Sequence, residues 1–117
     1  MIRSEEQPIG TAERAAVLLS TCPPGEAERL AAFLVEKHHA ACVNIVPGVT
    51  SVYRWEGKLQ RDTEALLVIK VRADRIEHVT RALVEEHPYD VPEVIALPLR
   101  GGHEPYLAWV LENAMGA

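Results

Sequence analysis

The sequence has few of the residues that mark secreted, membrane-spanning or nucleic-acid-binding proteins. Only two of its 117 residues are cysteine, and no apolar run approaches the roughly 20 residues of a membrane span. Lysine and arginine total 12 against 17 acidic residues, so a net charge of −5 offers no basic surface to nucleic acid or anionic lipid. The first residues lack the hydrophobic core of a signal peptide. We therefore expect a cytoplasmic protein with no membrane or nucleic-acid partner.

Motifs of catalysis are also missing. The chain has no glycine-rich phosphate loop, and Ser20, Thr21 and Ser51 have no base placed beside them in the sequence. We expect neither an enzyme nor an organic cofactor.

What is present fits one globular domain. Hydrophobic residues make up 48% of the chain and charged residues 25%, and the length is enough for a core without disulfides. Residues 1–14 have the composition of a disordered tail, and residues 15–117 are expected to form the domain.

Apolar runs and helical periodicity alternate along the chain. Strands are predicted over residues 15–21, 41–55, 58–71 and 94–97, and helices over about 26–39, from 76 to the proline at 88, and from 104. The order βαββαβ plus a C-terminal helix is the split βαβ, ferredoxin-like pattern, an α+β fold with an antiparallel sheet.

Local signals refine this prediction. Pro47-Gly48 predicts a bulge or bend within one strand, and Glu56-Gly57 predicts a tight hairpin turn. Asp74 and Glu77 have the spacing of a capping box at the start of the second long helix.

The predicted hairpin of residues 41–55 and 58–71 is too long for the domain. Fifteen extended residues span roughly 50 Å, whereas a compact chain of this size is only about 35 Å across. The ribbon should overhang the sheet, and an uncovered ribbon exposes unpaired edges unless another chain covers it. We therefore expect a homo-oligomer.

The stretch His87-Pro88-Tyr89-Asp90-Val91-Pro92-Glu93 concentrates polar chemistry between two prolines. Each proline biases the residue before it toward an extended conformation, so the upstream helix has to end here. Stiffly held polar groups lose little entropy when they bind. The segment is therefore either a site or a rigid structural clamp.

The expected topology brings Cys22, His87 and Glu93 to one end of the sheet. A thiolate, an imidazole and a carboxylate suit Cu(I), Cu(II) or Zn(II), although no close-spaced ligand pair such as C-x-x-C occurs there. The alternative is that His87 caps the preceding helix, Glu93 pairs with a cation, and Cys22 is a small buried residue.

The opposite end of the sheet collects His38, His39 and Cys42. Adjacent histidines on a helix point about 100° apart, which favours a plain helix end followed by a buried cysteine. Cys22 and Cys42 are expected too far apart for a disulfide. The acidic residues of the long hairpin, Glu56, Asp62 and Glu64, are expected to be solvated or paired across strands.

Three segments resemble one known family. Residues 40–58 (Ala-Ala-Cys-Val-Asn-Ile-Val-Pro-Gly-Val-Thr-Ser-Val-Tyr-Arg-Trp-Glu-Gly-Lys), residues 87–98 (His-Pro-Tyr-Asp-Val-Pro-Glu-Val-Ile-Ala-Leu-Pro) and residues 106–109 (Tyr-Leu-Ala-Trp) closely resemble the CutA divalent-cation tolerance proteins. The likeness spans about residues 15–113.

The resemblance implies a ferredoxin-like subunit in a tight trimer, like the PII signal proteins, and a role in tolerance to divalent metals, chiefly copper. It also implies metal ligands at His87 and Glu93, with a thiol from the end of the first strand, here Cys22. Two functions follow: a metal-homeostasis protein binding ions at a cleft between subunits, or a PII-like signalling or scaffold trimer whose cleft takes a small ligand or a protein.

Overall fold

The computed structural model describes residues 10–116. Its elements are α1 (Thr11–Arg14), β1 (Ala15–Cys22), η2 (Pro24–Glu26), α2 (Ala27–Glu36), β2 (Cys42–Trp55), β3 (Lys58–Arg72), η3 (Ala73–Arg75), α3 (Ile76–Glu86), β4 (Ile95–Pro98) and α4 (Glu104–Asn113). No helix within residues 10–116 is long and apolar enough to cross a bilayer.

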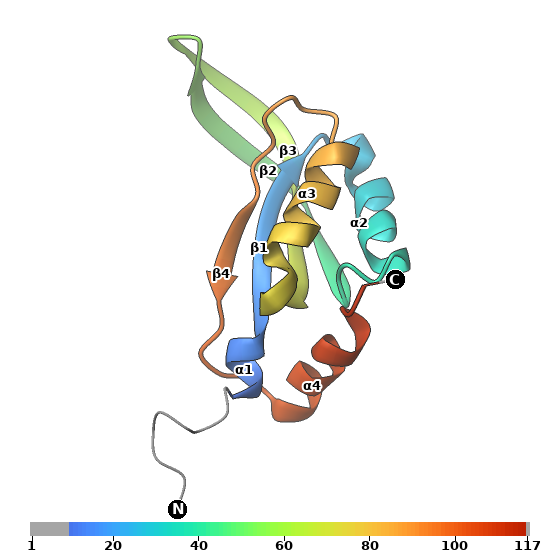
Figure 1. Cartoon of the computed structure of the whole chain (residues 1–117). Helices are drawn as coiled ribbons and strands as arrows, with labels where there is room; N and C mark the ends of the chain where they lie inside the picture. Colours follow the sequence, from blue (N-terminus) through green and yellow to red (C-terminus); the bar gives the residue numbers. More distant parts are fainter. Residues whose placement is uncertain (1–9, 117) are drawn as a thin grey trace, which may run out of the picture.

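The four strands form one antiparallel sheet in the order β2-β3-β1-β4, which confirms the predicted α+β fold. Figure 1 shows α2 and α3 side by side against one face of this sheet. Alternate residues of β1 and β3 point into that layer, where Leu18, Leu67 and Ile69 are fully buried against Leu34 and Leu83. This core fixes which face of the sheet is inside.

The other face of the sheet is mostly uncovered. Helix α4 packs only on its lower end, where Val110 and Leu111 meet Ala15. Beyond α4, Leu19 of β1 pairs with Val68 of β3 and with Ile95 of β4. These three residues lie outside the core that the sheet forms with α2 and α3. An apolar sheet face without a helix over it is typical of a subunit interface.

The β2–β3 hairpin overhangs the sheet as predicted (Figure 1). Strand β1 ends where Cys22 pairs with Ala65, so residues 49–55 and 58–64 pair only with each other. The molecule is 59 Å along its longest axis and 30 Å along the next. Glu56 (φ 50°) and Gly57 (φ 78°) both have positive φ, as a type I′ hairpin turn requires.

The predicted bulge also occurs in β2. The register with β3 shifts between Val46 and Val49, and Gly48 between them has φ 71°. Glycine adopts this conformation without the steric cost of a Cβ. The extra residue bends β2 where the hairpin leaves the sheet.

The prediction of a disordered tail over residues 1–14 is wrong for its last part. Residues 1–9 lie outside the described residues, but Thr11–Arg14 forms α1 and leads directly into β1. The Thr11 hydroxyl donates a hydrogen bond to the Glu104 carboxylate of α4. A tertiary contact, rather than local propensity, therefore orders this turn.

One predicted helix end and one predicted helix cap also differ from the structure. Helix α2 ends at Glu36 because His38 has φ 59° and the His39 N–H bonds back to the Leu34 carbonyl (2.9 Å), a Schellman-type end. The capping box at α3 does not form, because the Asp74 carboxylate accepts hydrogen bonds from the Arg72 guanidinium instead (2.9 and 3.0 Å).

Replacing His38 by glycine is expected to stabilise the protein by about 1 kcal/mol, because a non-glycine residue in the left-handed region is strained by roughly that amount. Chemical denaturation of His38→Gly and the parent protein measures the difference. Lys37→Gly is the matched control, since Lys37 has φ −86° and its replacement relieves no strain. If both variants lose stability equally, the strain at His38 is not as assigned.

Candidate functional site

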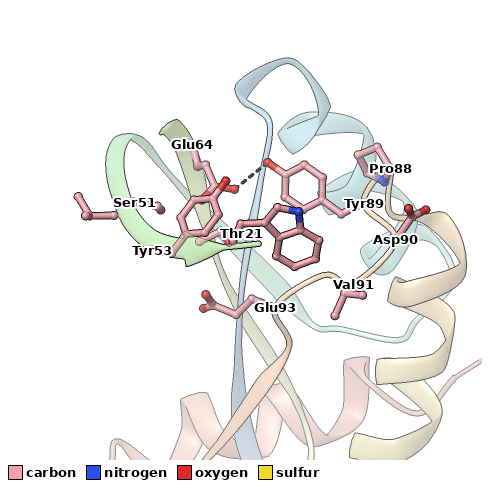
Figure 2. A pocket seen from close by; sticks show the side chains of 11 residues that line it. Thr21, Ser51, Tyr53, Glu64, Pro88, Tyr89, Asp90, Val91 and Glu93 are labelled. Carbon is pink, nitrogen blue, oxygen red and sulfur yellow. Dashed lines mark hydrogen bonds between the residues drawn. The ribbon is translucent and has the colours of Figure 1, made fainter. Parts of the chain in front are cut away.

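A cleft of about 700 Å³ lies between the overhanging hairpin and the connector that joins α3 to β4 (Figure 2). Its walls include Tyr53 and Trp55 from β2, Glu64 from β3, and Tyr89, Asp90 and Glu93 from the connector. Three carboxylates and three aromatic rings therefore surround it, and no lysine or arginine among the described residues lines it. The cleft lies at the end of β1 to which the expected topology brings His87 and Glu93.

The connector is fixed by His87 at its first residue. The backbone there is extended (φ −74°, ψ 140°), as expected of a residue before proline, and α3 ends one residue earlier. The ring is only 7% exposed, and its Nε2 lies 2.9 Å from the Thr21 carbonyl of β1. Because a carbonyl accepts only, Nε2 carries the proton and donates.

The second ring nitrogen of His87 is also engaged. The Tyr89 backbone N–H donates to Nδ1 at 3.1 Å, and the two rings pack with centroids 4.8 Å apart. His87 therefore ties the connector to the end of β1 and leaves no free nitrogen lone pair in this conformation. These contacts fit the interpretation of residues 87–93 as a rigid structural clamp. The His87 ring bonds the Thr21 carbonyl rather than the last carbonyls of α3, so it does not act as the cap of that helix.

Glu64 is the residue of this site that the sequence analysis misassigned. It is only 6% exposed, neither solvated nor paired with a basic residue across the strands, and its Oε2 accepts a hydrogen bond from the Tyr89 hydroxyl at 2.8 Å. Burial, and then this hydrogen bond, raise the pKa of Tyr89 well above its ordinary value. Tyr89 thus remains a neutral donor that keeps a buried carboxylate satisfied (Figure 2).

Cys22 lies at the same end of β1 but faces the helices. Its side chain is fully buried in the main core, opposite Ala65 of β3. Burial chiefly, and then the charges of Glu64 and Glu26, raise the pKa of the thiol. A buried protonated thiol is a poor metal ligand, because the thiolate is the form that binds.

Glu93 is the one member of the expected ligand set that is exposed at the cleft. Its backbone carbonyl accepts a hydrogen bond from the Ser20 hydroxyl at 2.7 Å, which fixes the end of the connector to β1. Cys22, His87 and Glu93 therefore gather at one end of β1, but they do not converge on one point. Within residues 10–116 no three His, Cys, Asp or Glu side chains are arranged to hold a metal ion.

Comparison with known proteins gives the family. The family described as CutA1 divalent ion tolerance protein matches residues 16–113. The chain belongs to this family. The chloroplastic CutA protein of Arabidopsis thaliana is 53% identical over 95 residues, which cover 80% of this chain and 52% of that protein.

Solved structures of the CutA1 family have the same fold. The divalent cation tolerance protein of Thermus thermophilus superposes with a TM-score of 0.81 at 45% identity, covering 85% of this chain and 97% of that one. A Nostoc structure described as a PII-like protein CutA in apo form gives a TM-score of 0.82 at 33% identity, covering 87% and 99%.

The relatives differ in length and in location. The chain spans about half to three fifths of the plant and Xenopus laevis relatives, but 95% of the Thermus thermophilus protein. The plant relatives are named chloroplastic, and a structure from Archaeoglobus fulgidus is named periplasmic. The family therefore occurs in more than one compartment.

Proposed function

We propose that this chain is a cytoplasmic divalent-cation tolerance protein that forms a homotrimer and binds divalent ions, copper among them, at the cleft beside the hairpin. The observation that carries the proposal is the cleft itself, whose wall holds Glu64, Asp90 and Glu93 without a balancing basic residue from residues 10–116. Such a wall favours cations by simple electrostatics. The role is one of binding, and no step of catalysis is assigned to it.

The homotrimer is supported by two surfaces of the subunit. One is the uncovered sheet face around Leu19 and Val68, and the other is the overhanging hairpin, whose Trp55 and Leu59 are exposed. A hairpin that pairs only with itself is marginal in water. Both surfaces are explained if each hairpin lies against the next subunit, which would place the cleft at the subunit boundary.

The proposed ligands are Glu93, His87 and Cys22. Their contacts in the subunit rank them by how much rearrangement each needs before it can bind an ion. Glu93 is exposed at the cleft and needs no rearrangement to bind. His87 has to exchange one hydrogen bond, that from the Tyr89 N–H to Nδ1, for the ion. Cys22 has to leave the core, so we expect the smallest contribution from it.

Titration of the trimer with Cu(II) and Zn(II) tests this ranking. We expect Glu93→Gln to weaken binding about tenfold or more, since it removes a charged ligand, and His87→Ala to weaken it as well. Cys22→Ala is expected to change the affinity least. Isothermal titration calorimetry measures each affinity directly.

Glu112→Gln is the matched control, because it removes an exposed carboxylate of α4 outside the cleft. If Glu93→Gln and Glu112→Gln bind like the parent protein, the ions do not use the cleft. If Cys22→Ala alone abolishes binding, the core opens for the metal and the ranking is reversed.

A second candidate is a PII-like signalling or scaffold trimer whose cleft takes a small molecule or a protein. It is favoured by the size of the cleft, about 700 Å³, which suits small organic ligands, and by its aromatic lining of Tyr53, Trp55 and Tyr89. A thermal-shift screen of metabolites tests it. A reproducible shift that Trp55→Ala removes supports this role, and no shift from any metabolite counts against it.

A further inference from the structure

A pair of histidines lies outside the cleft, where the C-terminal end of α2 meets the N-terminal end of α3. His39 follows α2, and His78 is the third residue of α3. Figure 1 shows these two helix ends side by side on the helix-covered side of the sheet, away from the hairpin. In the sequence His39 stands near His38 and Cys42, whereas His78 lies 39 positions further along, so only the fold brings the two rings together.

The fold holds the His39 ring in one place. Its backbone N–H bonds to the Leu34 carbonyl at 2.9 Å, and its ring packs on Phe33 with centroids 5.7 Å apart. On its other side the His78 ring lies 5.2 Å away, centroid to centroid. Nδ1 of His39 is buried and has no hydrogen-bond partner within residues 10–116. A buried polar atom without a partner calls for an explanation.

The spacing of the two rings matches that of a shared metal ion. A metal–nitrogen bond of about 2.0–2.1 Å places each imidazole centroid about 3.2 Å from the ion. Two neighbouring ligands therefore have centroids from about 4.5 Å apart at the right angle of a tetragonal Cu(II) site to about 5.2 Å apart at a tetrahedral angle. The observed 5.2 Å lies at the upper end of this range. His78 is exposed, so an ion reaches the pair from solvent.

The surroundings of His39 also favour its neutral imidazole, which is the form that binds metal ions. Burial, and then the neighbouring His78, Arg75 and Lys37, lower the pKa of His39. A neutral imidazole has a free lone pair, so a metal ion does not have to displace a proton from it. The same cationic neighbours oppose an ion electrostatically. The nearby acids do not offset them directly, since Asp74 is paired with Arg72 and Glu77 with Arg81.

We propose that His39 and His78 form a second divalent-cation site, separate from the cleft, that binds Cu(II) through two imidazoles and completes its coordination with water. Imidazole ligands suit Cu(II), Zn(II) and Ni(II), and Cu(II) binds tightest in the general order of affinities. With two protein ligands and cationic neighbours, the site is weaker than a closed structural site. It takes up free copper only when copper is abundant.

The experiment titrates the full chain carrying Glu93→Gln with Cu(II). This substitution weakens the proposed cleft site, so that a failure of the His39–His78 site can be told apart from a failure of the cleft site. We expect one remaining Cu(II) per chain, with an EPR spectrum that shows imidazole nitrogen. Adding His78→Gln is expected to lower that affinity about tenfold or more. Because His78 is exposed, this variant should keep its fold, which circular dichroism verifies.

His103→Gln in the same background is the matched control, since His103 is exposed and its side chain makes no capping hydrogen bond to α4. It is expected to leave the remaining copper binding unchanged. The proposal is overturned if Glu93→Gln binds no copper with imidazole coordination, or if His78→Gln and His103→Gln bind it equally well.

Discussion

Replacing Leu97 by aspartate is expected to convert the proposed trimer into monomers. Leu97 lies on β4 opposite Val17, on the sheet face that the helices leave uncovered, and it is 44% exposed in the isolated subunit. A carboxylate there costs the subunit little, but burying three unpaired charges in an assembled interface costs several kcal/mol for each. Size-exclusion chromatography with light scattering measures the change in mass.

Val84→Asp is the matched control for this prediction. Val84 is 40% exposed on α3, so the substitution introduces the same charge at a similar exposure on the opposite side of the sheet. It is expected to leave the proposed trimer intact. A trimeric Leu97→Asp protein would place the interface somewhere other than the uncovered sheet face.

Replacing Tyr89 by phenylalanine is expected to destabilise the protein by about 1–3 kcal/mol, because a buried acceptor loses its donor. The Glu64 carboxylate has 6% exposure, and the Tyr89 hydroxyl is its hydrogen-bond donor in the structure. Chemical denaturation measures the loss. Tyr106→Phe removes a hydroxyl from a similarly exposed tyrosine outside the cleft (41% against 37% for Tyr89), and it is expected to cost less.

The hydrogen bond between Tyr89 and Glu64 also predicts how the free energy of unfolding changes at high pH. The folded state raises the pKa of Tyr89, so its stabilising effect is fully present below the ordinary value of 10.0 and is lost as the pH rises above it. The unfolding free energy of the parent protein should therefore fall above that pH. In Tyr89→Phe this part of the fall should be absent. An equal fall in both proteins would contradict the assignment of Tyr89 as a neutral donor to the buried Glu64 carboxylate.

The sequence was enough to predict the sheet and the end of the sheet at which the candidate ligands gather. Apolar runs of strand length and helices at regular spacing give the βαββαβ order, and that order alone brings Cys22, His87 and Glu93 to one end of β1. The length of the segment around Pro47-Gly48 was enough to predict the overhanging hairpin. These predictions depend on periodicity and chain length, which a single sequence records directly.

The chemistry within the site depends on contacts between distant residues, which the sequence does not record. The position of the helices decides which side of β1 is buried. Cys22 faces that side, so its thiol lies in the core rather than in the cleft. Glu64 looked like a solvated strand residue, and its partner Tyr89 lies 25 positions away. The pairing of His39 with His78 likewise arises only where two helix ends meet.

Native mass spectrometry of the purified protein, exchanged into a volatile buffer with Cu(II), tests the proposed function most directly because it reports assembly and bound ions together. The proposal predicts a species with three times the 12.9 kDa mass of one chain, carrying copper that Glu93→Gln retains less well. A species at the mass of a single chain, or a trimer with the same copper content in both proteins, would contradict it.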